Sequence, residues 1–565
     1  MADEWNNPGT FHLGINMAGA VSAGAYTAGV LDFLTEALDE WYAAKSAANP
    51  AVPMHDVSID TLSGASAGGM CAAIAAVMVQ GDFQHIGNPS DPRLVNTTNK
   101  FYESWVNRID IEPLLQTNDL AAGKPVVSLL DSTIIDQIAD YAIAPVRGSA
   151  RPYISKSLTL FLTLTNVRGV PFSLHGDAPG SAEEEIAYYA DRLQFETVST
   201  IDQPTGSPLA WPLPIGKDGG AWDLLKGAAK ATGAFPLFLA PRKLDRLARE
   251  YNNSPWEPLS TDHPKPAPPS WKLQDNAPFS TLNVDGGVTE NDPFELAHDF
   301  LAVHNPLATI DPDTGDLVNP REAQTANCAV LTVAPFPSSA AYSEPYDFDA
   351  NSNVLGMLPK LFNVLISQSR FSGETLRAVM CGESFSRFVL APSDADRPDE
   401  NALQCGTLGA FGGFLERGFR AHDYQLGRRN CQKFLRDTFR LSATNPIIAA
   451  GLSRLDADAR LQVIASLGSI ANGVLTMPVI PLCGRADAEV PAPDRATITQ
   501  ARLNNVVKWS VSRLQAVANP LLSLALGSGM EDLAVRQAAD LLISTWAKKK
   551  LKQTLQEELK DVISG

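Results

Sequence analysis

One serine of this chain stands where an enzyme nucleophile would be expected. Ser66 is the middle residue of the stretch Gly-Ala-Ser-Ala-Gly at 64–68, after a β-prone segment at 57–62 and before an apolar, charge-free run at 67–79. A nucleophilic serine needs a sharp turn between a strand and a helix, flanked by small residues, because the backbone there passes close to itself. A plain glycine-serine turn can carry the same letters, but the strand before it and the helix after it favour a catalytic serine.

A serine nucleophile also needs a base that takes its proton. Asp285 ends the β-prone run 281–285 and precedes two glycines, although an Asp-Gly pair is also a common turn signal. A hydrolase with the order serine, acid, histidine would need a late histidine, for which the candidates are His298, His304 and His422. None of the three lies in a glycine-flanked loop at a strand end, and His298 lies in a helix-like stretch. The histidine-based hydrolase is therefore the weaker alternative.

A glycine-rich stretch near the start of the chain can supply backbone donors for an oxyanion. Residues 14–29 follow a predicted strand and open a predicted helix, so their amides can face the negative oxygen of a tetrahedral intermediate. A Walker phosphate loop would need Lys and then Ser or Thr after Gly24, where Ala25 and Tyr26 stand. The dinucleotide fingerprint is also missing, because the glycines are five residues apart. The stretch therefore indicates no nucleotide cofactor.

With these segments in this order, the chain resembles the patatin-like phospholipases over roughly residues 10–335. The matching pieces are the elbow around Ser66, the Asp-Gly-Gly at 285–287 and the block Thr-Gly-Ala-Phe-Pro at 232–236 between them. The resemblance implies a three-layer α/β fold with a mostly parallel central sheet and a Ser66–Asp285 dyad without histidine. It also implies hydrolysis of lipid carboxylic esters, of the phospholipase A, lysophospholipase or lipase type, through a covalent acyl-enzyme and with no metal or cofactor.

The first block of the chain departs from the family pattern Asp-Gly-Gly-Gly-x-Arg-Gly. Aligned back from residue 29, the chain has Ala-Gly-Ala-Val-Ser-Ala-Gly at 18–24, so two of the glycines and the arginine are absent. Backbone amides donate whatever side chain they carry, so the resemblance implies an oxyanion hole at Gly19, Ala20 and Val21. The missing arginine removes a charge beside the site and weakens the expectation of activity towards anionic phospholipids. A catalytically silent lipid-binding or protein-interaction scaffold of the same fold is the alternative.

A dyad without histidine makes one geometric demand. The carboxylate must touch the serine hydroxyl directly, within about 2.6–3.2 Å. The substitution Asp285→Asn keeps the shape of the side chain but cannot accept the proton, so we expect turnover to fall by about 10²-fold or more. At the level of the sequence we expect little change in stability, because the substitution is isosteric.

Composition and charge narrow the classes of protein. The 565 residues exceed one compact core, so we expect more than one domain, and 45% apolar with 19% charged residues describes a globular chain. A net charge of −18 argues against nucleic acid as a partner and against broad adsorption to anionic membranes. Six cysteines without a C-x-x-C pair support neither a disulfide framework nor a zinc site. The acidic and polar residues 1–10 differ from a secretion signal. We therefore expect a cytoplasmic protein that meets a lipid or membrane-surface ester, although signal-less export would leave no trace.

Strand-like and helix-like segments alternate in the first part of the chain. Predicted strands at 11–16, 57–62, 157–165 and 327–334 and predicted helices at 29–44, 67–79 and 222–231 indicate a mostly parallel sheet covered on both faces. We expect a catalytic domain at 1–345, with proline-rich loop or lid insertions near 203–220 and 252–278. Residues 346–565 are expected to be mainly helical, with no motif that assigns a role and with helices at 354–370, 411–420 and 501–563.

Three segments of the second part carry more specific expectations. Residues 461–483 hold no charge, but their polar and proline residues favour a buried helix ending before Pro478 over a membrane span. Residues 417–440 are basic and aromatic, and we interpret them as a solvated surface helix rather than a lipid-headgroup or partner face. The lysines at 548–550 and 552, followed by two glutamates, indicate an ordinary charged helix.

Overall fold

The computed structural model describes the greater part of the chain. The described residues are 5, 7–47, 51–87, 97–120, 125–146, 148, 151–174, 184–200, 203–217, 219–252, 268–312, 315–336, 384–394, 397, 402–526, 545 and 548–564.

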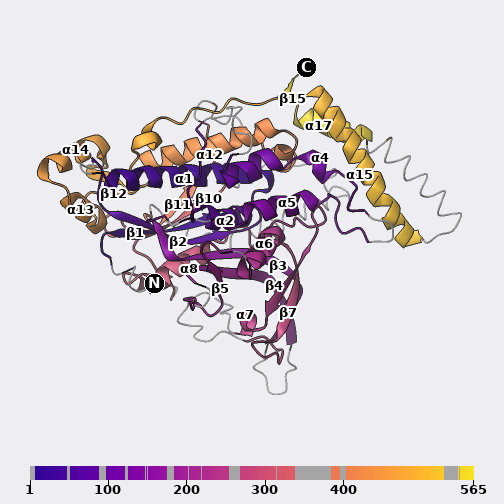
Figure 1. Ribbon diagram of the computed structural model, residues 1–565, viewed down its shortest axis with the longest axis horizontal. Helices are drawn as coiled ribbons and strands as arrows, with labels where there is room; N and C mark the ends of the chain where they lie inside the picture. The colour runs from indigo at the N-terminus through magenta and orange to yellow at the C-terminus, as the bar shows by residue number, and fades with distance from the viewer. Residues whose placement is uncertain are drawn as a thin grey trace.

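A large, mostly parallel sheet organises the described residues (Figure 1). Its strand order is β11 (Arg387–Leu390), β10 (Cys328–Val333), β1 (Thr10–Met17), β2 (Asp56–Gly64), β3 (Ile154–Leu174), β4 (Glu184–Val198) and β5 (Trp211–Pro214). Strand β7 (Pro278–Asp285) pairs with β3 and with β6 (Arg242–Leu247). Neighbours from β11 to β3 and the pair β4–β5 are parallel, whereas β3–β4, β3–β7 and β6–β7 are antiparallel. The α/β class and the four predicted strands are thus confirmed.

Strands in the middle of the sheet are covered on both faces. Successive side chains of a strand point to opposite faces, and β1 uses both. Phe11 and Leu13 belong to the main core, whereas a Cβ on Gly14 would lie 3.3 Å from Leu301 of α8 (Phe294–His304). The unbroken buried run Cys-Ala-Val-Leu-Thr-Val of β10 is typical of a parallel strand between helical layers.

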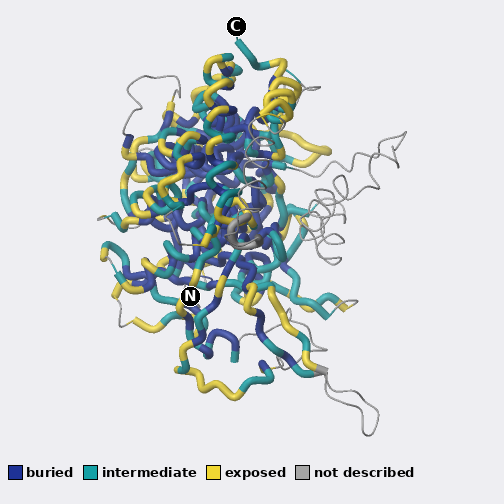
Figure 2. Tube along the Cα trace, turned by 90° about the vertical axis from the view of Figure 1, so that its right-hand side faces the viewer, coloured by how far each residue is buried: buried dark blue, intermediate teal, exposed yellow. Residues whose placement is uncertain are grey.

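Helices form the layers on the two sides of this sheet. Helices α1 (Gly24–Lys45), α2 (Ala67–Met78) and α12 (Arg417–Asp437) lie on one side and α8 lies on the other (Figure 1). Helix α6 (Ala221–Thr232) packs against α2 and β3. The helices predicted at 29–44, 67–79 and 222–231 are confirmed. Figure 2 shows the buried residues gathered in the middle of the molecule, with exposed residues towards its periphery.

Helix α12 is buried, so the prediction of a solvated surface helix at 417–440 is wrong. Its backbone meets that of α1, since a Cβ on Gly29 would lie 1.9 Å from the carbonyl oxygen of Tyr424. Arg428 forms ion pairs with Asp32 and Glu36 of α1, and all three side chains are buried. A buried charge is tolerated only with a partner. Here the acidic partners lie almost four hundred residues earlier in the chain, beyond the reach of any local pattern.

Residues 461–483 do not form the predicted single buried helix. They complete α14 (Ala457–Leu467) and then form a hairpin of β13 (Ser469–Ala471) and β14 (Val474–Pro478). The turn residues Asn472 and Gly473 both have positive φ, 50° and 77°, as a type I′ turn requires. The Asn-Gly pair was the available signal for this hairpin. Pairing of β14 with β12 (Arg440–Ser442) adds support that the local apolar pattern does not reveal.

The second part of the chain mixes helices with short strands. Strand β11 extends the central sheet beyond β10. Helix α15 (Gln500–Leu526) and the charged, largely exposed helix α17 (Lys548–Glu558) fall within the range predicted as helical at 501–563. At 411–420 the structure has a short 3₁₀ turn, η5 (Gly412–Phe414), and α12 begins only at Arg417.

Some predictions meet the structure only in part. The stretch 203–220 contains β5, an edge strand parallel to β4, and is therefore more than a loop. The boundary at 345, the helix at 354–370 and most of the stretch 252–278 lie outside the described residues. Within the described ranges, no helix has both the length and the apolar character needed to cross a membrane.

Candidate active site

Ser66 lies at a sharp turn between β2 and α2. Its backbone angles are φ 52° and ψ −127°, a conformation that is strained for any residue with a Cβ. The turn is so tight that a Cβ on Gly64 would lie 2.6 Å from the backbone of Gly68. A Cβ on Gly68 would lie 2.1 Å from the carbonyl oxygen of Met17. The small residues around Ser66 are therefore a steric requirement of the elbow, as the sequence indicated.

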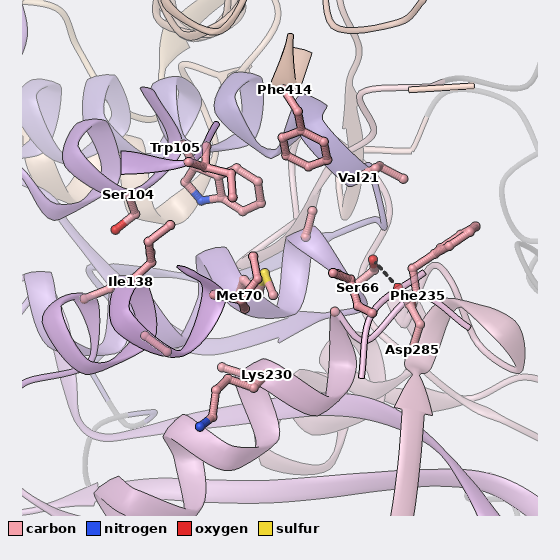
Figure 3. A pocket seen from close by; sticks show the side chains of 18 of the residues that line it. Val21, Ser66, Met70, Ser104, Trp105, Ile138, Lys230, Phe235, Asp285 and Phe414 are labelled. Atoms are coloured by element: carbon pink, nitrogen blue, oxygen red, sulfur yellow. Dashed lines mark hydrogen bonds between the residues drawn. The ribbon is translucent and has the colours of Figure 1, made fainter. Parts of the chain in front are cut away.

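Ser66 and Asp285 are in direct contact. The Ser66 hydroxyl donates a hydrogen bond to Asp285 Oδ2 at 2.7 Å, although 219 residues separate the two (Figure 3). Asp285 is the last residue of β7, where it pairs with Leu164 of β3. Its other carboxylate oxygen, Oδ1, accepts the N–H of Gly287 at 2.7 Å. The structure therefore satisfies the distance that a two-residue dyad demands.

The C-terminal end of α6 and the residues just after it are bonded to both members of this pair. Thr232 Oγ1 accepts the N–H of Ser66 at 2.8 Å, and the carbonyl oxygen of Ala234 accepts the N–H of Asp285 at 2.9 Å. From β3, Thr165 Oγ1 donates to the carbonyl oxygen of Asp285 at 2.8 Å. Sequence reasoning identified the block at 232–236 only through its resemblance and did not find this positioning role. A threonine before a helix-ending glycine carries no local signal for such a role.

Burial changes the acidity of the carboxyl group. Burial raises the pKa of Asp285 to about 7, and the hydrogen bonds from the Ser66 hydroxyl and the Gly287 amide act in the opposite direction. A carboxylate with a pKa near neutrality can take a proton from a hydroxyl as that hydroxyl attacks, and can return it afterwards. An exposed aspartate, with an ordinary pKa of about 3.9, is a much weaker base.

The three residues predicted as the oxyanion hole line a cavity with Ser66, but one of their backbone amides is already hydrogen-bonded. The N–H of Gly19 donates to the carbonyl oxygen of Asn291 at 3.0 Å, so this amide is already engaged. Among the described residues, the N–H groups of Ala20 and Val21 make no hydrogen bond. Val21 has φ 47°, which is unusual for a β-branched residue and is typical of functional sites that hold a strained backbone.

A further backbone donor follows the serine itself. Ala67 is the first residue of α2, and the first amides of a helix have no partner within the helix. In strand–elbow–helix nucleophile sites, the amide after the nucleophile usually faces the oxyanion. Sequence analysis omitted Ala67 because the resemblance directed attention to the glycine-rich loop. The available donors are therefore Ala20, Val21 and Ala67.

Two cavities meet at Ser66. The first, of about 90 Å³, is almost wholly apolar and runs between α2, α5 (Thr133–Ala142) and α6. Figure 3 shows Met70, Trp105 and Ile138 along it, with Phe235 beside Asp285. The second cavity, of about 310 Å³, is lined by the loop at 19–21, by Gly287 and Asn291, and by Gly406, Gly409 and Ala410. Ser66, Asp285, Val21 and Phe235 line both, so the hydroxyl stands at the junction.

The candidate histidines lie elsewhere. His298 and His304 are on α8, where they bond to Asp299 and to the carbonyl oxygen of Phe300. His422 is buried in α12 and bonds to its neighbour Asp423. None of the three lines either cavity at Ser66. The geometry therefore gives no support to the histidine-based alternative.

Over the described ranges, no cluster of histidine, cysteine, aspartate and glutamate is placed to hold a metal ion. The five cysteines in the described part of the chain, at 71, 328, 405, 431 and 483, are unpaired. Cys71 lies inside α2, where burial raises the pKa of its thiol, so it behaves as a small apolar side chain.

Comparison with known proteins gives one clear relative. The uncharacterized protein y4iI of Sinorhizobium fredii is 34% identical over 555 residues, which cover 91% of this chain and 76% of that protein. The chain matches no model of a known protein family. Among solved structures, VipD from Legionella pneumophila aligns over 99% of this chain and 92% of its own at 10% identity. The TM-score of that alignment is 0.18, which is too low to indicate a shared fold.

Proposed function

We propose that this chain, which belongs to the same family as the protein y4iI of Sinorhizobium fredii, is a serine acyl hydrolase of lipid carboxylic esters. The observation that carries the proposal is the 2.7 Å hydrogen bond from the Ser66 hydroxyl to Asp285 at the mouth of an apolar cavity. A patatin-like three-layer arrangement is part of the same proposal. It is supported by the order of the elbow, the 232–236 block and the Asp-Gly-Gly along the chain.

The chemistry begins with attack by Ser66. Its hydroxyl oxygen forms a bond to the ester carbonyl carbon while Asp285 Oδ2 takes the hydroxyl proton. The carbonyl oxygen becomes an oxyanion, and we assign its stabilisation to the N–H groups of Ala20, Val21 and Ala67. As the carbon–oxygen bond to the leaving alcohol breaks, Asp285 returns the proton to that alcohol. The acyl group then remains on Ser66.

Deacylation uses the same two residues, with water in place of the serine hydroxyl as the attacking group. Asp285 takes a proton from a water molecule, and the resulting hydroxide attacks the acyl carbon. The bond between that carbon and the Ser66 oxygen then breaks, Ser66 regains a proton from Asp285, and the carboxylic acid is released. The apolar cavity beside the elbow suits the hydrocarbon chain of the acyl group, because burying that chain removes apolar surface from water. The wider cavity, which is lined by the loop at 19–21 and by Asn291, suits the leaving alcohol.

A covalent probe tests the nucleophile. We expect a fluorophosphonate probe to label the wild-type chain at Ser66 and to leave Ser66→Ala unlabelled. Ser104→Ala is the matched control, because Ser104 lines the same apolar cavity without touching Asp285, and it should still be labelled. Absence of labelling in a wild-type protein whose circular dichroism shows it to be folded would overturn the assignment.

A catalytically silent scaffold is the second candidate, and one observation favours it. The amide of Gly19 is bonded to Asn291, which removes one of the three donors that the resemblance implied. A panel of short-chain p-nitrophenyl esters, lysophospholipids and neutral glycerides separates the two candidates. Turnover that disappears in Ser66→Ala supports the hydrolase, whereas lipid binding without any turnover supports the scaffold.

A further inference from the structure

An apolar tip projects from the protein beside the proposed active site. We define the tip as residues 235–239, which follow α6. Leu237 is 75% exposed and Phe238 is 36% exposed. A single exposed apolar residue on a protein surface is ordinary, so exposure alone does not assign a role. The surroundings of the tip indicate its role.

The tip is continuous with the apolar cavity. Phe235 and Leu239, on either side of the exposed pair, both line that cavity. Phe411, from the distant η5 region, also lines it and lies 5.4 Å from Phe238 and 5.7 Å from Phe235, centroid to centroid. An apolar path therefore leads from the exposed Leu237 and Phe238, past the rings of Phe411 and Phe235, to the cavity that Ser66 lines.

The tip is held outward by a specific network. The carbonyl oxygens of Leu237 and Phe238 accept the N–H groups of Leu129 and Leu130 at 2.8 and 2.9 Å. The carbonyl oxygens of Ser128 and Leu129 in turn accept hydrogen bonds from the buried Arg513 of α15. These hydrogen bonds therefore hold the backbone that carries the exposed Leu237.

Leu237 is displayed in a strained conformation. Its φ is 68°, a left-handed value that a residue with a Cβ rarely adopts and that glycine would adopt without strain. Strain of this kind persists mainly where the surrounding structure enforces it for a function. Exposure of a large apolar side chain at the cost of backbone strain has no benefit for folding.

We propose that the tip inserts Leu237 and Phe238 into the surface of an electrically neutral lipid aggregate, so that an acyl chain passes from it along the apolar path to Ser66. This inference rests on the proposed function, because it assigns a use to the cavity of that site. The neutral surface is favoured because the chain carries a net charge of −18, which opposes adsorption to an anionic membrane. A second copy of the chain is the competing occupant, and the experiment distinguishes it.

Flotation with phosphatidylcholine vesicles tests the docking without turnover, when every protein carries Ser66→Ala. We expect Leu237→Asp to lower the partition coefficient by about tenfold or more, since it removes the burial of one large apolar side chain. The matched control is Ile470→Asp in the β13–β14 hairpin, because Ile470 is 76% exposed but does not line the apolar cavity, and binding should not change. Equal binding of the two variants would overturn the proposal.

A second variant keeps the test decisive if Leu237→Asp folds poorly. Leu237→Gly removes the side chain and relieves the strained φ, so its melting temperature should be equal to or above that of the parent while vesicle binding falls. Binding that is retained in Leu237→Gly contradicts the proposal. Self-association that depends on Leu237, without vesicle binding, would show that the tip binds a second copy of the chain and not a lipid surface. Failure of the fluorophosphonate probe to label wild type overturns the hydrolase and is a separate result, since the flotation measures no chemistry.

Discussion

Replacing the buried Asp285 by asparagine should have opposite effects on turnover and on stability. The amide has the same shape, its oxygen can still accept the N–H of Gly287, and its NH₂ group can donate to the Ser66 hydroxyl oxygen. It cannot take the serine proton. We therefore expect the turnover of a soluble p-nitrophenyl ester to fall by about 10²-fold or more.

The same substitution should stabilise the folded protein at neutral pH. Burial raises the pKa of Asp285 to about 7, compared with about 3.9 in the unfolded chain. Because the folded pKa is the higher one, this group's contribution to stability is fully present below about pH 4 and is lost as the pH rises through about 7. At about 1.36 kcal/mol for each pKa unit, the advantage of the asparagine variant should grow by about 2.5 kcal/mol between pH 5 and pH 8. The sequence alone suggested little change in stability.

Denaturation by urea at the two pH values measures this difference. The control is Asp223→Asn, since the side chain of Asp223 is 73% exposed, and its effect on stability should be small at both pH values. An advantage for Asp285→Asn that is the same at pH 5 and pH 8 would refute the argument from burial. Turnover near that of wild type would show that Asp285 marks only a turn, and the dyad would be abandoned.

Three further results are expected. The kcat/KM for a soluble ester should rise with pH and level off above about 7, as Asp285 loses its proton; a rate that falls from pH 5 to pH 8 would contradict the assignment of the base. Thr232→Val removes the acceptor for the N–H of Ser66 and should lower kcat about tenfold with little change in KM. Thr232→Ser should restore the rate, and equal rates in the two variants would remove the positioning role. Arg428→Met removes the ion-pair partner of the buried Glu36, while Asp32 keeps its contact with His85, and it should destabilise the fold by about 3–5 kcal/mol, which thermal denaturation will measure and an unchanged melting temperature would contradict.

Local chemistry was enough to predict the elements that carry the candidate site. The small residues around Ser66 are required by a turn in which an added Cβ would meet backbone at 2.1–2.6 Å, and such steric limits are visible in the letters themselves. The strands β1, β2, β3 and β10 and the helices α1, α2 and α6 follow from apolar patterns within single segments. The α/β class could be predicted for the same reason, because parallel strands buried on both faces are apolar throughout.

Other features depend on residues that are distant in the chain. The buried α12 was mistaken for a surface helix because the partners of Arg428 are on α1. The hairpin at 469–478 was mistaken for part of a helix, although its Asn-Gly turn was a local signal that outweighed the apolar run. The engagement of the Gly19 amide by Asn291 was likewise invisible, because a backbone amide has no sequence signature.

The sequence by itself determined which side chains are available for chemistry, and the tertiary structure decided how they act. Ser66 and Asp285 were identifiable as types in suitable local settings. Only the pairing of β7 with β3 and the bonds to Thr232 and Ala234 bring the hydroxyl and the carboxylate to 2.7 Å. Only burial raises the pKa of Asp285 to about 7. Contact distance and desolvation are both set by atoms far away in the chain, so no local pattern of residues can encode them.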